Sequence, residues 1–201
     1  MKADIDLLLF DLGGVVVPWV GMEALADRAG MSVEDARAHF EQSDILKGYQ
    51  RGASRDAAFL DALSQRFALD APRTVLARHW KDWVRPPFPG VIDAIRTLGD
   101  DFATACLSNT NALHWERLHE LFDLKAVFDP ALASHELKLA KPDPAIFQTV
   151  IDRTGVAPDR ILFFDDSPEN VRAARAMGMR SEPVDPMQGV LPVLKRLGLV
   201  A

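Results

Sequence analysis

The 201-residue chain has one cysteine and one tyrosine, and it contains no long apolar run and no cluster of basic residues. A single cysteine, Cys106, cannot form a disulfide within the chain. No apolar stretch reaches the roughly 20 residues that a membrane-spanning helix requires. The net charge of −6 makes nucleic acid an improbable partner. We therefore expect no membrane and no nucleic-acid partner, although a local cationic site can still bind a small anion.

The remaining composition is that of an ordinary globular protein, with 48% hydrophobic and 26% charged residues. A chain of this length can bury one good core and has room for a smaller second unit. Acidic residues occur in the first six positions, where a secretory signal would need an apolar run. We expect a cytoplasmic protein in which Cys106, set in an apolar strand, is a buried and inert thiol.

The order of the expected elements predicts an α/β fold with a doubly wound parallel sheet. Helices and strands alternate in the second half of the chain, which is typical of parallel sheets. Strands are expected at 6–10, 102–107 and 160–164, with a weak one at 126–128. Helices are expected at 91–98, 111–121, 144–154 and 167–177.

Residues 18–85 have a different character, with amphipathic helical patterns and no convincing strand. Ser32 and Asp35 form a capping-box pattern, Ser54 opens another helix, and Pro72 suits the start of a third. A stiff, proline-rich segment at 86–90 marks the end of this stretch. We interpret it as a helical insertion after the first strand.

Asp11 follows the apolar residues of the first strand and precedes Leu12 and two glycines. A buried carboxylate is costly unless it is paired or binds a metal. It is either a turn cap or a functional group. Together with the segments described next, we favour a nucleophile or metal ligand, because a carboxylate can attack phosphorus to give an aspartyl-phosphate.

Two further segments offer donors for an anion. Ser108 and Asn109 stand where a strand ends and a helix begins, so free backbone N–H groups and these side chains can bind an anion there. They also suit simple N-capping. Lys141 lies in a Lys-Pro-Asp-Pro turn, where the prolines would fix the loop, although a solvated surface lysine is the alternative.

Asp165 and Asp166 directly follow another apolar run. Two adjacent carboxylates repel each other, and a Mg²⁺ ion removes the conflict, whereas the alternative is a helix start. A phosphoryl group needs an attacking oxygen, donors for its oxygens and a divalent metal. The four segments together predict a metal-dependent phosphoryl-transfer site.

These residues resemble the motifs of the haloacid dehalogenase superfamily, which consists mainly of phosphatases. The matching segments are Phe10-Asp11-Leu12-Gly13-Gly14-Val15, Leu107-Ser108-Asn109, Lys141 and Asp165-Asp166. The resemblance implies a Rossmann-like core of residues 1–17 and 86–201 and a helical cap of residues 18–85. Leu107–Asn111 with His114, Phe163–Asp166 and Tyr49–Gly52 are also similar to the bacterial α-D-glucose-1-phosphate phosphatases.

The resemblance also implies roles for individual residues. Asp11 would be the nucleophile, and Lys141 would neutralise the transferring phosphoryl group, which Ser108 and Asn109 would also bind. The Mg²⁺ ligands would be Asp11, Asp165, Asp166 and the backbone carbonyl of Gly13. Asn170 would have a supporting role. Contacts with the substrate or the cap are expected from Trp19, Arg51, Gly52 and His114.

Gly13 departs from the family pattern. Most family phosphatases have a second Asp there, which protonates the leaving group and activates water, and such help is typically worth about 10²–10⁴-fold. Either a cap residue or water substitutes, or the leaving group needs little protonation, or the protein is a poor enzyme. His114 is the nearest titratable candidate in sequence, although packing is the more common role for such a histidine.

Three hypotheses follow. The first is a Mg²⁺-dependent phosphatase of small phosphomonoesters, with sugar phosphates as the leading class. The second is a haloacid dehalogenase using the same Asp11 without metal, against which the Asp165-Asp166 pair argues. The third is a catalytically idle protein that binds a phosphorylated ligand or a partner, which Gly13 favours. A monomer and a homodimer are both compatible with the sequence.

Overall fold

The computed structural model describes residues 4–200, so residues 1–3 and 201 of the expected core lie outside the described part. At its centre is a five-stranded parallel sheet with the order β3-β2-β1-β4-β5. The strands are β1 (Leu7–Phe10), β2 (Ala103–Ser108), β3 (Ala131–Ala133), β4 (Ile161–Asp165) and β5 (Arg180–Pro183). The predicted α/β fold with a doubly wound parallel sheet is confirmed.

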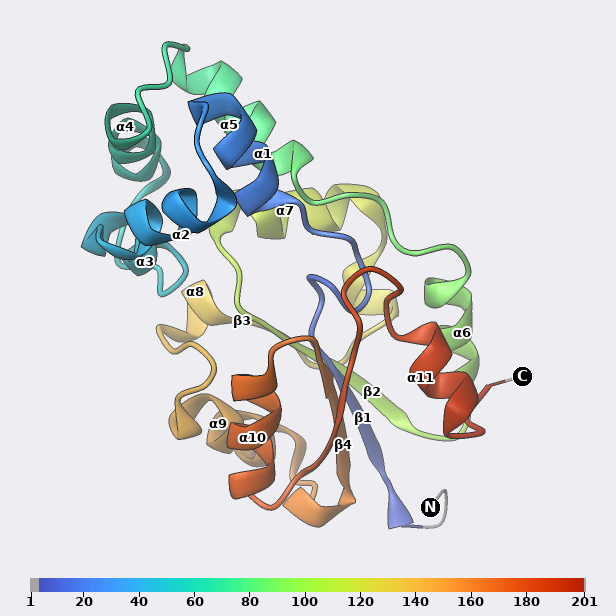
Figure 1. Cartoon of the computed structure of the whole chain (residues 1–201). Coiled ribbons are helices and arrows are strands. Elements are labelled where there is room, and N and C mark those ends of the chain that lie inside the picture. The colour runs from blue at the N-terminus through green and yellow to red at the C-terminus, as the bar shows by residue number, and fades with distance from the viewer. Residues whose placement is uncertain (1–3, 201) are drawn as a thin grey trace.

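Helices surround this sheet on both faces (Figure 1). They are α6 (Val91–Leu98), α7 (Ala112–Leu121), α8 (Ser134–Leu137), α9 (Pro144–Thr154), α10 (Pro168–Ala176) and α11 (Leu191–Arg196), with 3₁₀ turns η2 (Leu124–Ala126) and η3 (Pro158–Arg160). Successive side chains of a strand point to opposite faces. Leu8 and Phe10 accordingly pack with α6, α7 and α11, whereas Leu7 and Leu9 pack with α9 and α10. Coverage of both faces explains why β1 is an unbroken apolar run.

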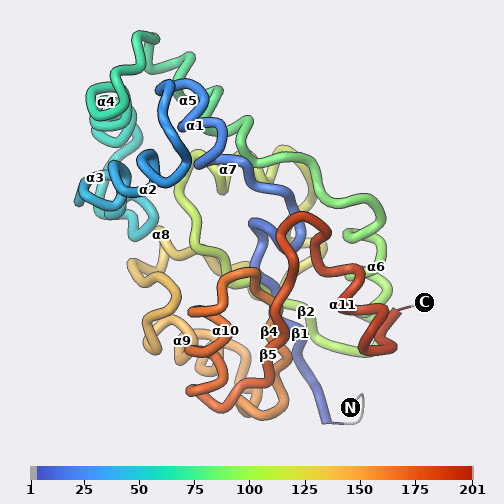
Figure 2. The backbone as a smooth tube through the Cα atoms, in the orientation of Figure 1, coloured from blue at the N-terminus to red at the C-terminus, as the bar shows by residue number. Residues whose placement is uncertain are grey.

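A helical insertion lies between β1 and β2 in the sequence and above the strand ends in Figure 2. Its helices are α1 (Gly21–Ala29), α2 (Val33–Glu41), α3 (Asp44–Tyr49), α4 (Asp56–Arg66) and α5 (Arg73–Asp82). It has an apolar core of its own, in which Tyr49 stacks on Phe59 with ring centroids 4.0 Å apart. Leu113 of α7 joins that core, so the insertion packs against one helix of the sheet layer.

The two segments that connect the insertion to the sheet run side by side. The Val20 N–H donates to the Trp83 carbonyl over 3.1 Å, and the Arg85 N–H donates to the Pro18 carbonyl over 3.0 Å. This pairing fixes where the insertion stands relative to the strand ends. No helix within residues 4–200 has the length and apolar character that crossing a membrane requires.

The helix signals of the sequence are mostly confirmed. Helices α6 and α9 have the predicted bounds, and the Ser32 hydroxyl accepts a hydrogen bond from the Asp35 N–H over 3.0 Å, as the capping box requires. One start was wrong, because Arg55 rather than Ser54 precedes α4. The Ser54 hydroxyl instead donates to the Ile45 carbonyl over 3.0 Å and so ties down the preceding turn.

The strand signals were weaker. The prediction of a strand at 126–128 was wrong. Residue 126 is the last residue of η2, residues 127 and 128 belong to the loop that follows, and Phe128 packs against Phe10 with ring centroids 5.8 Å apart. The strand there is β3, whose sequence Ala-Leu-Ala carries little apolar signal. Strand β5 was not predicted either, because Arg-Ser-Glu-Pro at the sheet edge contains no apolar run.

Candidate active site

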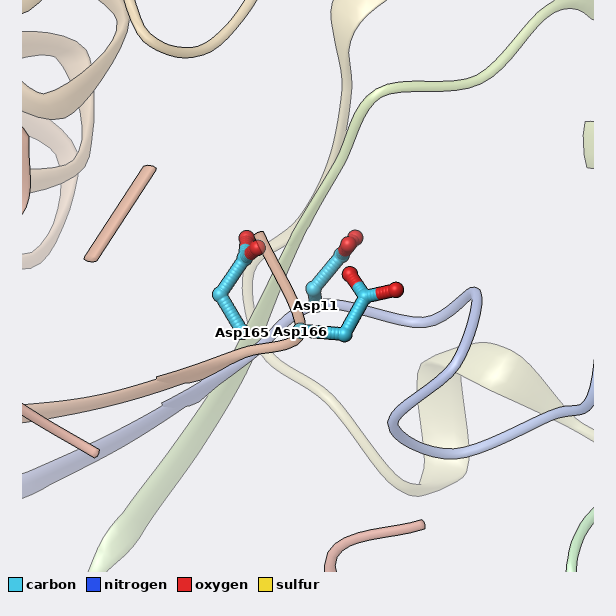
Figure 3. Close-up of side chains that lie close together, drawn as sticks. All are labelled: Asp11, Asp165 and Asp166. Atoms are coloured by element: carbon cyan, nitrogen blue, oxygen red, sulfur yellow. The ribbon is translucent and has the colours of Figure 1, made fainter. Parts of the chain in front are cut away.

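Three carboxylates meet at the carboxyl edge of the sheet. Asp11 follows β1, Asp165 ends β4, and Asp166 comes next, and each offers an oxygen within 4.8 Å of the others (Figure 3). The side-by-side register of Phe10 and Phe164 is what brings the two strand ends together. Asp165 is fully buried and Asp11 nearly so. The sequence prediction that these acids share one site is therefore geometrically sound.

Lys141 reaches these acids from the loop before α9. Its ammonium Nζ lies 2.6 Å from Asp165 Oδ2 and 3.0 Å from Asp11 Oδ1, and the side chain is completely buried. Burial alone would lower the pKa of Lys141, but the adjacent Asp11 and Asp165 outweigh it and raise that pKa. Lys141 is thus a fixed cation, not the solvated surface lysine that the sequence left open.

Asn109 holds the Lys141 main chain. Its Oδ1 accepts from the Lys141 N–H over 2.8 Å, and its Nδ2 donates to the Lys141 carbonyl over 2.8 Å. The amide therefore positions the ammonium, a role that the sequence did not indicate. Ser108, also expected to bind phosphate, is buried at the end of β2 and lines the same cavity as Asp11.

The two carboxylates of the pair differ in their surroundings. Asp165 accepts hydrogen bonds from Lys141, from the Ser167 N–H over 2.8 Å, and from Asn170 Nδ2 over 3.0 and 3.1 Å. Within residues 4–200 no side chain donates a hydrogen bond to Asp166, which lines the cavity. Burial, followed by the charge of Asp165, raises the pKa of Asp166. Asp165 therefore anchors the site, and Asp166 faces the ligand space.

The unsatisfied groups of the site fit a divalent cation. Asp11 Oδ1 is buried and no donor from the described residues is directed at it as a hydrogen bond, although the Lys141 ammonium is 3.0 Å away. Burial, together with the charges of Asp165 and Asp166, raises the pKa of Asp11 to about 7 against the effect of Lys141. Carboxylate oxygens are the ligands that Mg²⁺ prefers. A cation held by Asp11 and Asp166, with the Gly13 carbonyl, would stabilise the ionised acids.

The two glycines after Leu12 serve different purposes. Gly14 has a φ of +72°, and a Cβ on it would stand 2.6 Å from Asp166 Oδ2, so a side chain there would displace the acid. A Cβ on Gly13 would meet only Trp19 Cβ, at an ordinary 3.7 Å. A Cβ therefore fits at position 13 without a clash.

A cavity of about 550 Å³ lies between this edge of the sheet and the insertion. Of the expected contact residues, Trp19, Arg51 and His114 line it, whereas Gly52 does not. Gly52 instead packs on the core, where its carbonyl accepts from Lys138 Nζ over 3.0 Å. A Cβ at this position would stand 2.2 Å from the His135 carbonyl oxygen, so Gly52 permits the close approach of insertion and core.

His114 joins the insertion to the core. Its Nε2 donates to the Trp80 carbonyl over 2.9 Å, its Nδ1 accepts from Asn111 Nδ2 over 3.2 Å, and its ring stacks on the Trp80 ring with centroids 4.9 Å apart. Burial lowers the pKa of His114 to about 4. Both nitrogens of the neutral ring are occupied, so the geometry favours the packing role over proton transfer.

This burial predicts a pH-dependent stability. The unfolded chain takes up a proton at His114 below its ordinary pKa near 6.5, whereas the folded chain does so only near 4. The free energy of unfolding should thus decrease as the pH falls between these values, by about 2 kcal/mol from pH 7 to pH 4.5. Urea unfolding of wild type and His114→Gln measures this, because other titrating groups are common to both. We expect the stability advantage of wild type to shrink by that amount, and a constant difference would contradict the assignment.

Sequence reasoning missed several residues of the site. The Ser134 hydroxyl accepts from the Thr110 N–H over 2.9 Å and donates to the Gln50 carbonyl over 2.7 Å, which ties the insertion to the loop after Ser108. Arg37 and Lys47 line the cavity from the insertion. On exposed helices such cations look like solvated charges, and nothing in the sequence pattern distinguishes them.

The fold is similar to that of solved structures. A HAD family enzyme of Bacteroides thetaiotaomicron, solved as a magnesium complex, superimposes with a TM-score of 0.82 at 23% identity, over 96% of this chain and 99% of that one. The same enzyme is also known in complex with magnesium and inorganic phosphate. At this identity the likeness concerns the fold.

Curated relatives match parts of the chain. A phosphorylated carbohydrates phosphatase of Thermotoga maritima is 39% identical over 64 residues, which are 32% of this chain and 29% of that protein. An (S)-2-haloacid dehalogenase of Pseudomonas is 29% identical over 96 residues, 48% of this chain and 41% of that protein. The chain thus spans less than half the length of these relatives.

The family itself is decided by a longer match. The model of the haloacid dehalogenase-like hydrolases matches residues 5–178, which include Asp11, Ser108, Lys141 and the Asp165-Asp166 pair. The resemblance seen in the motifs is thereby confirmed. The chain belongs to the haloacid dehalogenase-like hydrolases.

Proposed function

We propose that this protein is a Mg²⁺-dependent phosphatase of small phosphomonoesters, with phosphorylated sugars as the leading substrates. The observation that carries the proposal is the floor of the cavity, where a buried lysine lies within 3.0 Å of both Asp11 and Asp165 while Asp166 faces the ligand space. The phosphorylated carbohydrates phosphatase among the relatives supports the substrate class.

The reaction would run through Asp11. One of its carboxylate oxygens forms a bond to phosphorus while the bond from phosphorus to the leaving oxygen breaks, which gives an aspartyl-phosphate and an alkoxide that takes its proton from water. Water then attacks phosphorus, so that inorganic phosphate leaves and the Asp11 carboxylate is restored. Lys141 and Ser108 would donate to the phosphoryl oxygens, and Asn109 would hold Lys141 in place. The metal would neutralise charge on the phosphoryl group.

Two other functions are candidates for this site. A haloacid dehalogenase would use Asp11 to attack a carbon atom and needs no metal. The Asp166 carboxylate in the cavity would then have no role in the reaction. The similarity to a haloacid dehalogenase is the reason to test this candidate. An idle binding protein is favoured by Gly13, since no acid stands there to protonate a leaving alkoxide.

Metal dependence separates these candidates. Phosphate release is measured from α-D-glucose 1-phosphate, sorbitol 6-phosphate and p-nitrophenyl phosphate, with Mg²⁺ and after chelation. We expect release with Mg²⁺ and a fall to background after chelation, restored by adding Mg²⁺ again. Metal-independent chloride release from 2-chloropropionate would instead establish a dehalogenase. Absence of both reactions would favour the idle protein.

A further inference from the structure

The insertion side of the cavity carries cations that the proposed chemistry does not use. Arg37 of α2, Lys47 of α3 and Arg51 just after α3 all line it. Among the described residues, Arg37 and Arg51 have no ion pair within 4.0 Å, and Lys47 pairs only with the fully exposed Asp44, at 3.3 Å. One acid of the insertion, Glu41, lines the cavity as well, so this wall remains positively charged.

The floor of the cavity does not require these cations. Its three acids, Asp11, Asp165 and Asp166, face Lys141 and the divalent metal that they fit, and Glu169 of α10 is the one further acid that the core adds to the described lining. Glu41 stands one helical turn after Arg37, yet no ion pair joins them. Arg37, Lys47 and Arg51, which form the positively charged wall of the cavity, are therefore available to bind a ligand that fills it.

A second anionic group on the substrate would suit this wall. Arg and Lys bind carboxylate and phosphate through charge-assisted hydrogen bonds, which are about twice as strong as hydrogen bonds between neutral groups. A cavity of about 550 Å³ has room for a hexose phosphate whose far end reaches the insertion. A neutral sugar would leave Arg37 and Arg51 without a charged partner among the described residues.

We propose, on the basis of the phosphatase function above, that the substrate carries a second anionic group away from the transferring phosphoryl group, held by Arg37, Lys47 and Arg51. A phosphorylated sugar acid and a sugar bisphosphate share this chemistry. The three residues would then select substrates, whereas the Asp11 floor performs the reaction.

The test uses three ligands that differ only at carbon six: α-D-glucose 1-phosphate, α-D-glucuronic acid 1-phosphate and α-D-glucose 1,6-bisphosphate. We expect kcat/KM with Mg²⁺ to be about 10- to 100-fold higher for at least one anionic ligand than for glucose 1-phosphate. The carboxylate and bisphosphate arms show which anion is preferred. Arg37→Gln and Arg51→Gln should each reduce this preference about tenfold. The control Arg55→Gln, an exposed arginine of the insertion outside the cavity, should keep it.

Failure of this inference and failure of the proposed function give different results. Release from p-nitrophenyl phosphate, which has no second anion, reports on the phosphatase alone. If the protein hydrolyses none of these compounds, the three hexose ligands are titrated into it calorimetrically with Mg²⁺, and the same preference is expected in Kd. Equal kcat/KM or Kd for the neutral and anionic ligands would overturn the proposal. So would a preference that survives in Arg37→Gln and Arg51→Gln.

Discussion

Asp11→Asn should lose phosphate release with Mg²⁺ by a factor on the order of 10⁴ or more, as removal of a nucleophile does elsewhere. The amide has nearly the same size as the carboxylate but cannot attack phosphorus. The variant should keep its fold, because Asp11 is one of three crowded carboxylates and the replacement removes charge repulsion among them. Initial rates of phosphate release and thermal unfolding, compared with wild type, measure the two effects.

A matched control keeps this result specific. Asp93→Asn changes an exposed carboxylate of α6 whose one ion pair within residues 4–200, with Arg96, spans 3.8 Å, and it should leave the rate unchanged. If Asp11→Asn keeps more than roughly a tenth of the wild-type rate, Asp11 is not the nucleophile. A rate lost together with the fold would be visible in the unfolding curve.

Gly13→Asp is expected to accelerate hydrolysis of alkyl phosphates such as glucose 1-phosphate by about 10²–10⁴-fold. An acid at this position could protonate the leaving alkoxide and later activate water. The position can accept it, because its Cβ would find only Trp19 Cβ, at 3.7 Å. The gain should be much smaller for p-nitrophenyl phosphate, whose leaving group needs no proton. Steady-state kcat on both substrates measures the contrast.

Gly13→Asn is the control for this variant, since it fills the same space without a titrating group. We expect it to stay near the wild-type rate on glucose 1-phosphate. An equal gain from Asn and Asp would show that the side chain acts by filling space. No gain from Asp would show that another group already performs the proton transfer in the wild-type protein.

Much of the floor of the site could be predicted from the sequence. Asp11, Asp165 and Asp166 each follow an apolar run, and parallel strands place such positions at one edge. The expected helix at 144–154 also matches the bounds of α9, Pro144–Thr154. The edge strands β3 and β5 could not be predicted, because neither has an apolar run and each is stabilised by its neighbour in the sheet.

The sequence did not predict which side chains of the site contact one another. Asn109 was expected to bind phosphate, and the structure shows its amide hydrogen-bonded to the Lys141 main chain, 32 residues later. His114 was the candidate acid by its nearness in sequence, and its ring is committed to Trp80 across the insertion boundary. The first pairing depends on how the loop after β2 meets the loop before α9, and the second depends on how the insertion sits on the sheet. No local pattern encodes either.

The measurement that tests the account most directly is acid-quenched mass spectrometry of the wild-type protein during turnover of glucose 1-phosphate with Mg²⁺. The account predicts a phosphorylated peptide containing Asp11. Its absence from Asp11→Asn completes the assignment. Phosphate release without any phosphorylation of that peptide would contradict the aspartyl-phosphate and with it the central role of Asp11.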